Sequence, residues 1–98
     1  MFEPIEVVGG GTVKVINKNF GSITFNSGGE IAVSPPTTPS GYTFLTAIPY
    51  TYSGTTKGAI SCMGGNGNYL QGTPNITVTS ITVRYIYVKS ENIETSTV

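Results

Sequence analysis

The sequence predicts an all-β fold: a single compact antiparallel β-sandwich over residues 1–98, with a jelly roll as one form that this sandwich could take. Three observations favour it. Fifteen threonines, ten isoleucines, nine valines and six tyrosines enrich the chain in good strand formers. Short segments with apolar residues at every second position indicate strands with one buried face. Thirteen glycines and six prolines separate these segments and predict turns.

The first part of the chain contains strand patterns around a glycine pair. Residues 12–20 begin with an alternating pattern that fades halfway through. Residues 22–26 and 30–34 alternate on both sides of Gly28-Gly29, and this arrangement predicts a β-hairpin. The proline-rich segment 34–41 cannot be a central strand, so we expect it to cross to a second sheet.

A proline interrupts the strand pattern in the middle of the chain. Residues 42–48 alternate, and Pro49 follows without a backbone N–H, so the strand should end, bulge or lie at a sheet edge there. We take residues 42–48 as the strand itself. Residues 58–63 predict a short apolar strand, the Gly- and Asn-rich residues 64–68 a turn, and Tyr69-Leu70 another short strand.

The strongest strand pattern lies at residues 75–89. The apolar residues before and after Thr79-Ser80 have opposite parity, which predicts a β-bulge or a break of the strand at this pair. Seven or eight strands are expected in all. They lie between an entry segment at about residues 1–11 and a polar tail at about residues 91–98 that we expect to fray.

The charge and hydropathy of the chain exclude several classes of partner. Five basic and five acidic residues give a net charge of zero without a basic stripe, so we expect no nucleic-acid partner. No apolar run reaches the roughly 18 residues of a membrane span, so no membrane insertion is expected. The N-terminus carries no signal-peptide pattern.

Catalytic side chains are scarce. The chain has no histidine, aspartate or tryptophan, so it can build neither a Ser-His-Asp triad nor a histidine metal site. Cys62 has no second cysteine as a partner, and a buried apolar role is expected for it. The five glutamates lie at the N-terminal entry, beside one turn and in the tail, where charges are normally solvated. We therefore expect no enzyme activity, no metal site and no cofactor.

Tyrosine and asparagine side chains near turns are the candidate ligand-binding residues. A tyrosine ring can stack on a pyranose while its hydroxyl forms hydrogen bonds. Loops on a rigid sandwich present such side chains outward without disturbing the core. The predicted glycan-binding residues are Tyr52, Asn66, Asn68 and Tyr69. In the alternative interpretation these residues belong to ordinary turns, and the strand aromatics only fill the core.

Residues 42–48 carry no charge on either face of the predicted strand. The row predicted to pack into the core is Tyr42, Phe44 and Ile48. Its expected partners are Val83 and Tyr85. The opposite row would face a neighbouring subunit. If both uncharged faces stayed in water, a small domain would lose much of the stabilisation that comes from burying apolar side chains. The predicted subunit-interface residues are Thr43, Leu45, Ala47, Ile86 and Val88.

Two segments resemble a known family. GYTFLTAIPY, residues 41–50, followed by ITVRYIYVKS, residues 81–90, resembles the C-terminal domain at the distal tip of bacteriophage or prophage tail fibres and minor structural proteins. The segment GSITFNSGGEIAV and the closing Tyr87–Ser90 add to the resemblance, which covers about residues 20–90. It implies a non-catalytic virion domain, commonly a homotrimer, that binds a host cell-surface polysaccharide or protein. It supplies no fixed binding residues.

Two other functions fit the same residues. The chain could be a purely structural subunit of a virion or surface assembly, without a receptor of its own. It could also be a carbohydrate-binding module of a secreted protein, although the missing tryptophan and signal peptide weaken this interpretation.

Overall fold

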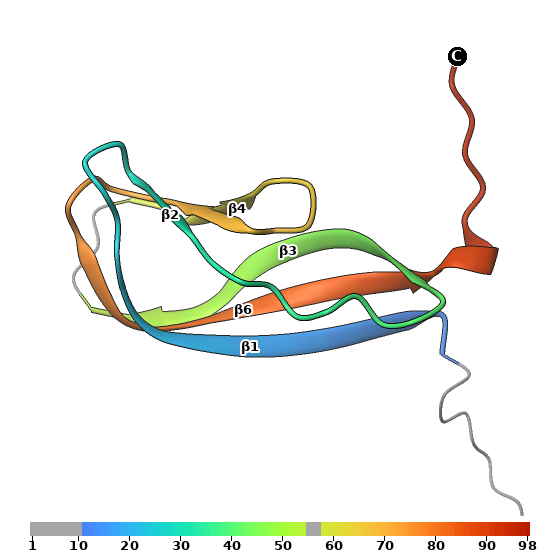
Figure 1. Ribbon diagram of the computed structural model, residues 1–98, viewed down its shortest axis with the longest axis horizontal. Helices are drawn as coiled ribbons and strands as arrows, with labels where there is room; N and C mark the ends of the chain where they lie inside the picture. The colour runs from blue at the N-terminus through green and yellow to red at the C-terminus, as the bar shows by residue number, and fades with distance from the viewer. Residues whose placement is uncertain (1–10, 55–57) are drawn as a thin grey trace, which may run out of the picture.

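The computed structural model describes residues 11–54 and 58–98 and confirms an all-β fold (Figure 1). Two antiparallel three-stranded sheets pack around one core. Sheet A contains the long strands β1 (Val13–Thr24), β6 (Thr77–Lys89) and β3 (Tyr42–Ser53), in that order. Sheet B contains the short strands β2 (Glu30–Ala32), β5 (Tyr69–Gln71) and β4 (Ser61–Met63), in that order. A 3-10 turn, η1 (Ser90–Asn92), follows β6.

Six strands lie in the described part of the chain, where seven or eight were expected. A jelly roll has eight strands arranged as two Greek keys, so these residues adopt a simpler sandwich. Segment 33–41 runs back along sheet A before β3 begins (Figure 1). The predicted entry segment 1–11 lies almost wholly outside the described residues, and the tail beyond η1 is exposed. Within the described ranges, no helix is long and apolar enough to cross a membrane.

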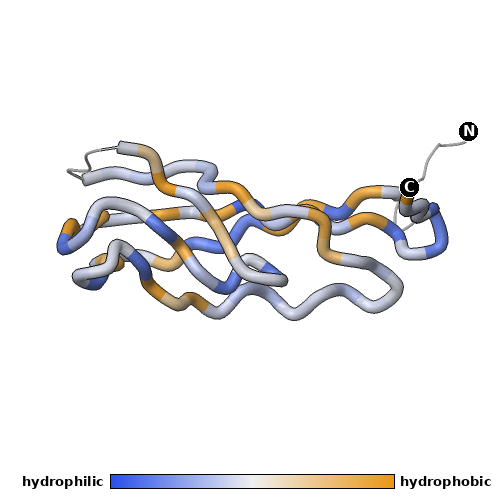
Figure 2. Tube along the Cα trace, turned by 90° about the horizontal axis from the view of Figure 1, so that it is seen from above, coloured by the Kyte–Doolittle hydropathy of each residue, from blue (hydrophilic) through white to orange (hydrophobic). Residues whose placement is uncertain are grey.

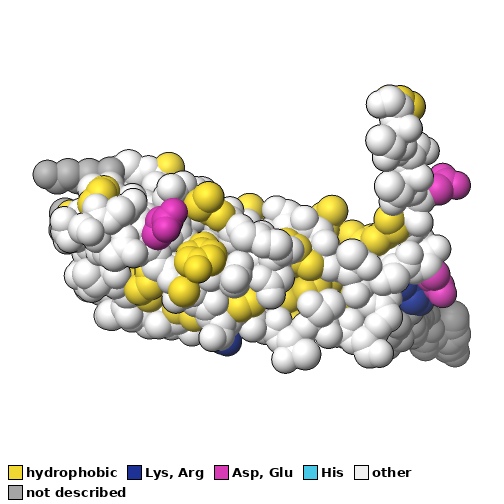
Figure 3. Space-filling view, turned by 45° about the horizontal axis from the view of Figure 1, so that its top comes forward, with side chains coloured by type: hydrophobic (Ala, Val, Ile, Leu, Met, Phe, Trp, Pro, Cys, Tyr) yellow, Lys and Arg dark blue, Asp and Glu magenta, His cyan; other side chains and the backbone are white. Residues whose placement is uncertain are grey.

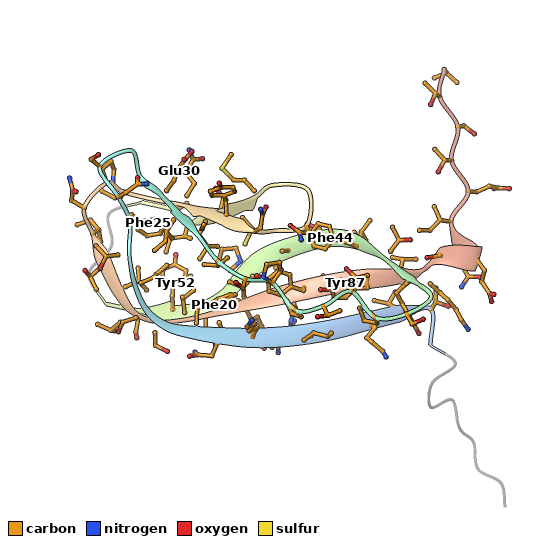
Figure 4. All side chains as sticks on the ribbon, viewed as in Figure 1. Phe20, Phe25, Glu30, Phe44, Tyr52 and Tyr87 are labelled. Atoms are coloured by element: carbon orange, nitrogen blue, oxygen red, sulfur yellow. The ribbon has the colours of Figure 1, made fainter. Side chains whose placement is uncertain are left out.

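The hairpin predicted around Gly28-Gly29 is wrong, because the chain changes sheets at this turn. β1 pairs with β6, whereas β2 pairs with β5. The turn itself is present, since the amide of Gly29 donates to the carbonyl of Asn26 over 2.9 Å. Phe25, just before the turn, is 1% exposed and lies between the two layers (Figure 4). Phe25 thus lies where the chain passes from sheet A to sheet B, and its burial contributes to the contact between the layers.

β3 continues past the predicted strand 42–48 and ends at Ser53. Pro49 is tolerated because β3 is an edge strand of sheet A, which has one side without ladder partners. A register shift between Pro49 and Thr51 places a β-bulge directly after the proline. Of the three alternatives expected at Pro49, the edge position and the bulge occur, whereas the strand end that we took at residue 48 is wrong.

An earlier bulge in β3 reverses part of the predicted face assignment. The register shifts at Leu45, and the parity of the strand changes after this extra residue. Tyr42 and Phe44, before the bulge, pack against the core as expected. Beyond it, Ala47 is buried in the core, whereas Ile48 is 45% exposed on the outer face. The predictions that Ile48 fills the core and that Ala47 faces a neighbouring subunit are both wrong.

Of the bulge or break predicted at Thr79-Ser80, the structure shows a β-bulge, because β6 continues through this pair. Ile81 of β6 pairs with Gly21 of β1, and the next aligned pair is Val78 with Ile23. β6 therefore advances three residues where β1 advances two, and the extra residue changes the strand's parity. This change lets Val78 and Ile81 both be buried on the same side of sheet A.

The core lies between the layers, and most of its largest buried side chains come from β6. The rings of Phe44 and Tyr87 meet edge to face with their centroids 6.0 Å apart. The buried hydrophobic residues are Ile23, Phe25, Ala47, Ile60, Leu70, Val78, Ile81, Val83, Tyr85 and Tyr87. Figure 2 shows how hydrophobic positions alternate with more polar ones along the strands that supply this core.

Sheet B follows the sequence prediction in part. β4 begins at Ser61 rather than at residue 58, and β5 spans Tyr69–Gln71. The turn between them, residues 64–68, has positive φ angles at Gly64 (92°) and Gly67 (76°). Glycine adopts this conformation without steric cost, and the turn predicted from the composition of this segment is confirmed.

Candidate functional site

The outer face of sheet B carries exposed side chains around one tyrosine. The register pairs Tyr69 with Ala32 on one side and with Met63 on the other, so that the three form a row across the sheet. Tyr69 is 43% exposed and Met63 is 40% exposed. The second row on this face consists of Glu30, Gln71 and Ser61. Figure 3 shows an acidic side chain beside hydrophobic ones on this part of the molecule.

An open hollow lies beside Tyr69. It is lined by Glu30, Met63, Gly64 and Tyr69 and has a volume of about 260 Å³. The tyrosine ring and the thioether of Met63 offer apolar surface, and the carboxylate of Glu30 accepts hydrogen bonds. An apolar platform next to a hydrogen-bond acceptor suits a hydroxylated ligand such as a sugar. Glu30 and Met63 were not among the predicted binding residues, because their sequence neighbours do not reveal which residues face Tyr69 across the sheet.

The turn that leads into β5 places the two predicted asparagines in different environments. Asn66 is exposed. Asn68 is half-buried, and its Oδ1 atom is buried without a hydrogen-bond partner in the described part of the chain. A methyl group added to Gly64 would overlap this oxygen, so the Asn68 side chain packs against its own turn. Asn66 is therefore the accessible member of the pair, although it does not line the hollow.

Tyr52 does not join this group. It lies on β3 in sheet A, where it pairs with Ile81, and it is 41% exposed. Figure 4 shows Tyr52 near sheet A and Glu30 near sheet B. Tyr69 on β5 and Asn66 in the turn before it therefore lie close in the chain, whereas Tyr52 lies on the other layer.

The other predicted interface residues lie on sheet A. Thr43 is exposed on its outer face, and the bulged Leu45 is 62% exposed. Ile86 and Val88 of β6 are half-buried on the same outer face as Thr43. Four further exposed residues of β1 and β3 were missed: Val13, Val15, Ile48 and Tyr50. The last two were missed because no residue type marks the bulge that shifts the faces of β3.

Few groups in the described residues suit acid–base or nucleophilic chemistry. Burial raises the pKa of the half-buried Cys62 thiol to about 11, so this thiol stays protonated and weakly nucleophilic near neutral pH. Burial also raises the pKa of the Tyr85 and Tyr87 hydroxyls. No group of three possible metal ligands occurs in the portion of the chain that the structure describes.

No protein-family model, no curated protein and no solved structure matches the chain. Its function must therefore be inferred from its own residues and their geometry.

Proposed function

We propose that the chain is a non-catalytic adhesion module of a phage or prophage virion, located at the tip of a tail fibre, where it binds a host cell-surface glycan. The glycan site in this proposal is the outer face of sheet B around Tyr69. The resemblance of residues 41–50 and 81–90 to tail-fibre tip domains supports this setting. The scarcity of catalytic side chains supports binding over catalysis.

One observation carries the proposed site: a strand tyrosine stays exposed beside a hollow. Fully burying a large apolar side chain stabilises a protein by roughly 1.5–3 kcal/mol, so an exposed tyrosine gives up part of that stabilisation. Tyr69 nevertheless stays exposed to solvent, where it lines the hollow together with Met63. In the proposed complex a sugar ring stacks on Tyr69, and one of its hydroxyls donates a hydrogen bond to the carboxylate of Glu30.

Binding of labelled protein to candidate host cells, before and after surface polysaccharide is stripped, tests this proposal. We expect stripping to remove most of the binding. We expect Tyr69→Ala to weaken binding by about tenfold, because the stacked ring contributes both apolar contact and orientation. The melting temperature should stay close to that of the parent, since Tyr69 lies outside the core.

Tyr52→Ala is the matched control, because Tyr52 has a similar exposure on the other sheet. It should bind as the parent does. An equal loss in both variants would contradict a site on sheet B. Undiminished binding to stripped cells would contradict a glycan receptor and favour a protein receptor instead.

A second candidate function, a structural assembly subunit, is favoured by the exposed apolar side chains on the outer side of sheet A. In this proposal a homotrimer forms through the region of Leu45 and Val88, and small residues such as Thr43 permit close approach of the chains. Sedimentation should then show an oligomer at micromolar concentration, and Leu45→Glu should dissociate it. A stable monomer would contradict this function.

A further inference from the structure

The outer face of sheet A holds an arginine in a fixed orientation. Arg84 is the single arginine of the 98 residues. It lies in the middle of β6, the central strand, between Asn17 of β1 and Ile48 of β3. Its guanidinium carbon lies 3.7 Å from the centroid of the Tyr50 ring, and its Nε atom donates to Oδ1 of Asn17 over 3.0 Å.

These two contacts restrict different motions of the guanidinium. Stacking on Tyr50 holds the plane of the group against the ring, and the bond to Asn17 sets its rotation within that plane. The side chain thereby loses rotamer freedom before any ligand arrives, so a ligand that binds it has less ordering cost to overcome. The Nε–H is engaged, and the N–H groups on the two Nη atoms remain as donors.

No acidic side chain among the described residues neutralises Arg84. The ion pair found there joins Lys89 and Glu91, beyond the central part of the sheet. Glu30 lies on the outer face of sheet B. The one hydrogen bond of Arg84 in residues 11–54 and 58–98 is the bond from Nε to Asn17, and the two Nη atoms have no acceptor in these ranges. A guanidinium that is held in place without a counterion is ready to receive an anion.

The neighbouring cations do not share this position. Lys14 and Lys18 of β1 align with Tyr87 and Val83 on the inner side of the sheet. The ammonium of Lys14 lies 5.2 Å from the Tyr42 ring centroid, and that of Lys18 donates to the carbonyl of Ser34. Arg84 is thus the cation that the described part of sheet A presents at the centre of its outer face.

We propose that Arg84, Tyr50 and Asn17 form a binding site for the carboxylate of an acidic sugar, such as a hexuronic acid in a surface polysaccharide. The two carboxylate oxygens accept hydrogen bonds from the guanidinium fork in a planar, bidentate arrangement. The exposed Ile48 and Val15, at 45% and 48%, flank the site and contact the apolar face of the sugar ring. A single fixed positive charge matches a singly charged carboxylate better than a doubly charged phosphate.

This site is independent of the glycan site proposed on sheet B, because the two lie on the outer faces of opposite layers. The failure of one therefore leaves the other intact. If both exist, one polysaccharide chain or two neighbouring ones could engage the same module at two points, which would increase avidity without any new contact.

A ¹⁵N-edited NMR titration tests the proposal directly, because the chain has one arginine and its Nε–Hε signal needs no assignment. The probe is trigalacturonate, and its fully methyl-esterified form is the uncharged control. We expect the Arg84 signal to shift saturably with trigalacturonate and to stay in place with the methyl ester. An unmoved Arg84 signal with trigalacturonate would overturn the proposal, as would an equal shift with the ester.

Variants distinguish binding through the planar guanidinium from binding through positive charge alone. Arg84→Lys keeps the charge but loses the planar fork and should weaken trigalacturonate binding by about tenfold. Asn17→Ala and Tyr50→Leu keep the charge and lose one restraint each, and each should weaken binding severalfold. Lys89→Gln, which removes a charge elsewhere, should bind as the parent does. Parent-like affinity in Arg84→Lys would contradict the proposal.

Two further measurements cover the other occupants of this surface. Tripolyphosphate should bind more weakly than trigalacturonate. Tighter binding of tripolyphosphate would show that the site prefers phosphate to carboxylate and would overturn the proposal. Sedimentation of the parent gives the mass of the species present, and the Arg84 signal should respond to trigalacturonate in that species. An oligomer in which the Arg84 signal no longer responds to ligand would assign the surface to a second copy of the chain.

Discussion

The two sheets of this sandwich differ in length, and the difference determines which of them can be stable without the other. The strands of sheet A have 12 or 13 residues, whereas each strand of sheet B has three. Strands of three residues form too few ladder bonds to be stable by themselves. Sheet B therefore depends on the contact of Leu70 and its neighbours with the long sheet. In the function proposed above, the short sheet presents Tyr69 on its outer face, while its inner residue Leu70 belongs to the shared core.

The junction between the sheets is close, and two glycines make it possible. A methyl group at Gly72 would lie 2.7 Å from the ring of Phe25. A methyl group at Gly67 would lie 2.9 Å from Cβ of Ala47 and 3.0 Å from the ring of Tyr85. All three distances are shorter than ordinary carbon–carbon contacts. The comparison of the sheets can therefore be tested at this junction, where sheet B gains its support.

The largest effect is expected from Phe25→Ala. Removing this buried ring from between the layers should cost about 3–5 kcal/mol of the free energy of unfolding and release sheet B first. Phe20→Ala is the matched control, because Phe20 is only half-buried at a bulge of β1. Chemical denaturation combined with amide hydrogen exchange measures both. Equal losses for the two variants would contradict a special role of Phe25 at the junction.

A smaller contrast is expected between the two leucines of the chain. Leu70 has no exposed surface, so Leu70→Ala should cost about 2–5 kcal/mol in the free energy of unfolding. Leu45 is 62% exposed, and Leu45→Ala should change it by less than about 0.5 kcal/mol. Urea denaturation of both variants compares them directly. A stability loss in Leu45→Ala similar to that of Leu70→Ala would show that the bulge at Leu45 is covered in solution.

Gly67→Ala and Gly21→Ala compare a glycine packed between the sheets with a glycine of β1 that has no close neighbour. Both glycines have positive φ, at 76° and 69°, so alanine at either position costs about 1–2 kcal/mol of backbone strain. Gly21 has no neighbouring atom within 4 Å of an added methyl group, whereas Gly67 meets Ala47 and Tyr85. Gly67→Ala should therefore be less stable than Gly21→Ala by roughly 1–3 kcal/mol, measured by thermal unfolding. Equal stabilities would mean that the turn separates from sheet A at little cost.

The most gradual effect is expected at alkaline pH. The pKa of Cys62 is raised from 9.0 to about 11 in the folded protein, so above pH 9 the unfolded chain loses this proton first. Stability should be fully present below pH 9 and decline as the pH rises towards 11. The raised pKa values of Tyr85 and Tyr87 act in the same direction. Urea midpoints at pH 8 and pH 10.5 should show a smaller decline for Cys62→Ala than for the parent; identical declines would contradict the assignment to Cys62.

Several features of the fold could be predicted from the sequence because they depend on local chemistry. The missing N–H of Pro49 predicted an end, a bulge or an edge position, and the last two of these occur. A change of parity predicted a bulge or a break at Thr79-Ser80, where a bulge occurs. Gly and Asn predicted the turn at residues 64–68. For the candidate site, the sequence proposed Tyr69 as a ligand-binding residue; this role stays a prediction, and the structure places Tyr69 on β5, exposed beside a hollow. The bulges and the turn could be predicted because particular residue types favour one backbone conformation or one side of a strand.

Only the tertiary structure decided which strands pair and which faces meet. The turn after Phe25 has the sequence pattern of a hairpin, yet its flanking strands pair with β6 and β5 in different sheets, and Phe25 is buried between the layers. The bulge at Leu45 has no signature of its own, so the sequence assigned Ala47 and Ile48 to the wrong faces. Pairing and register depend on side chains far apart in the chain, and the free energy of burying them together cannot be assigned to any single segment.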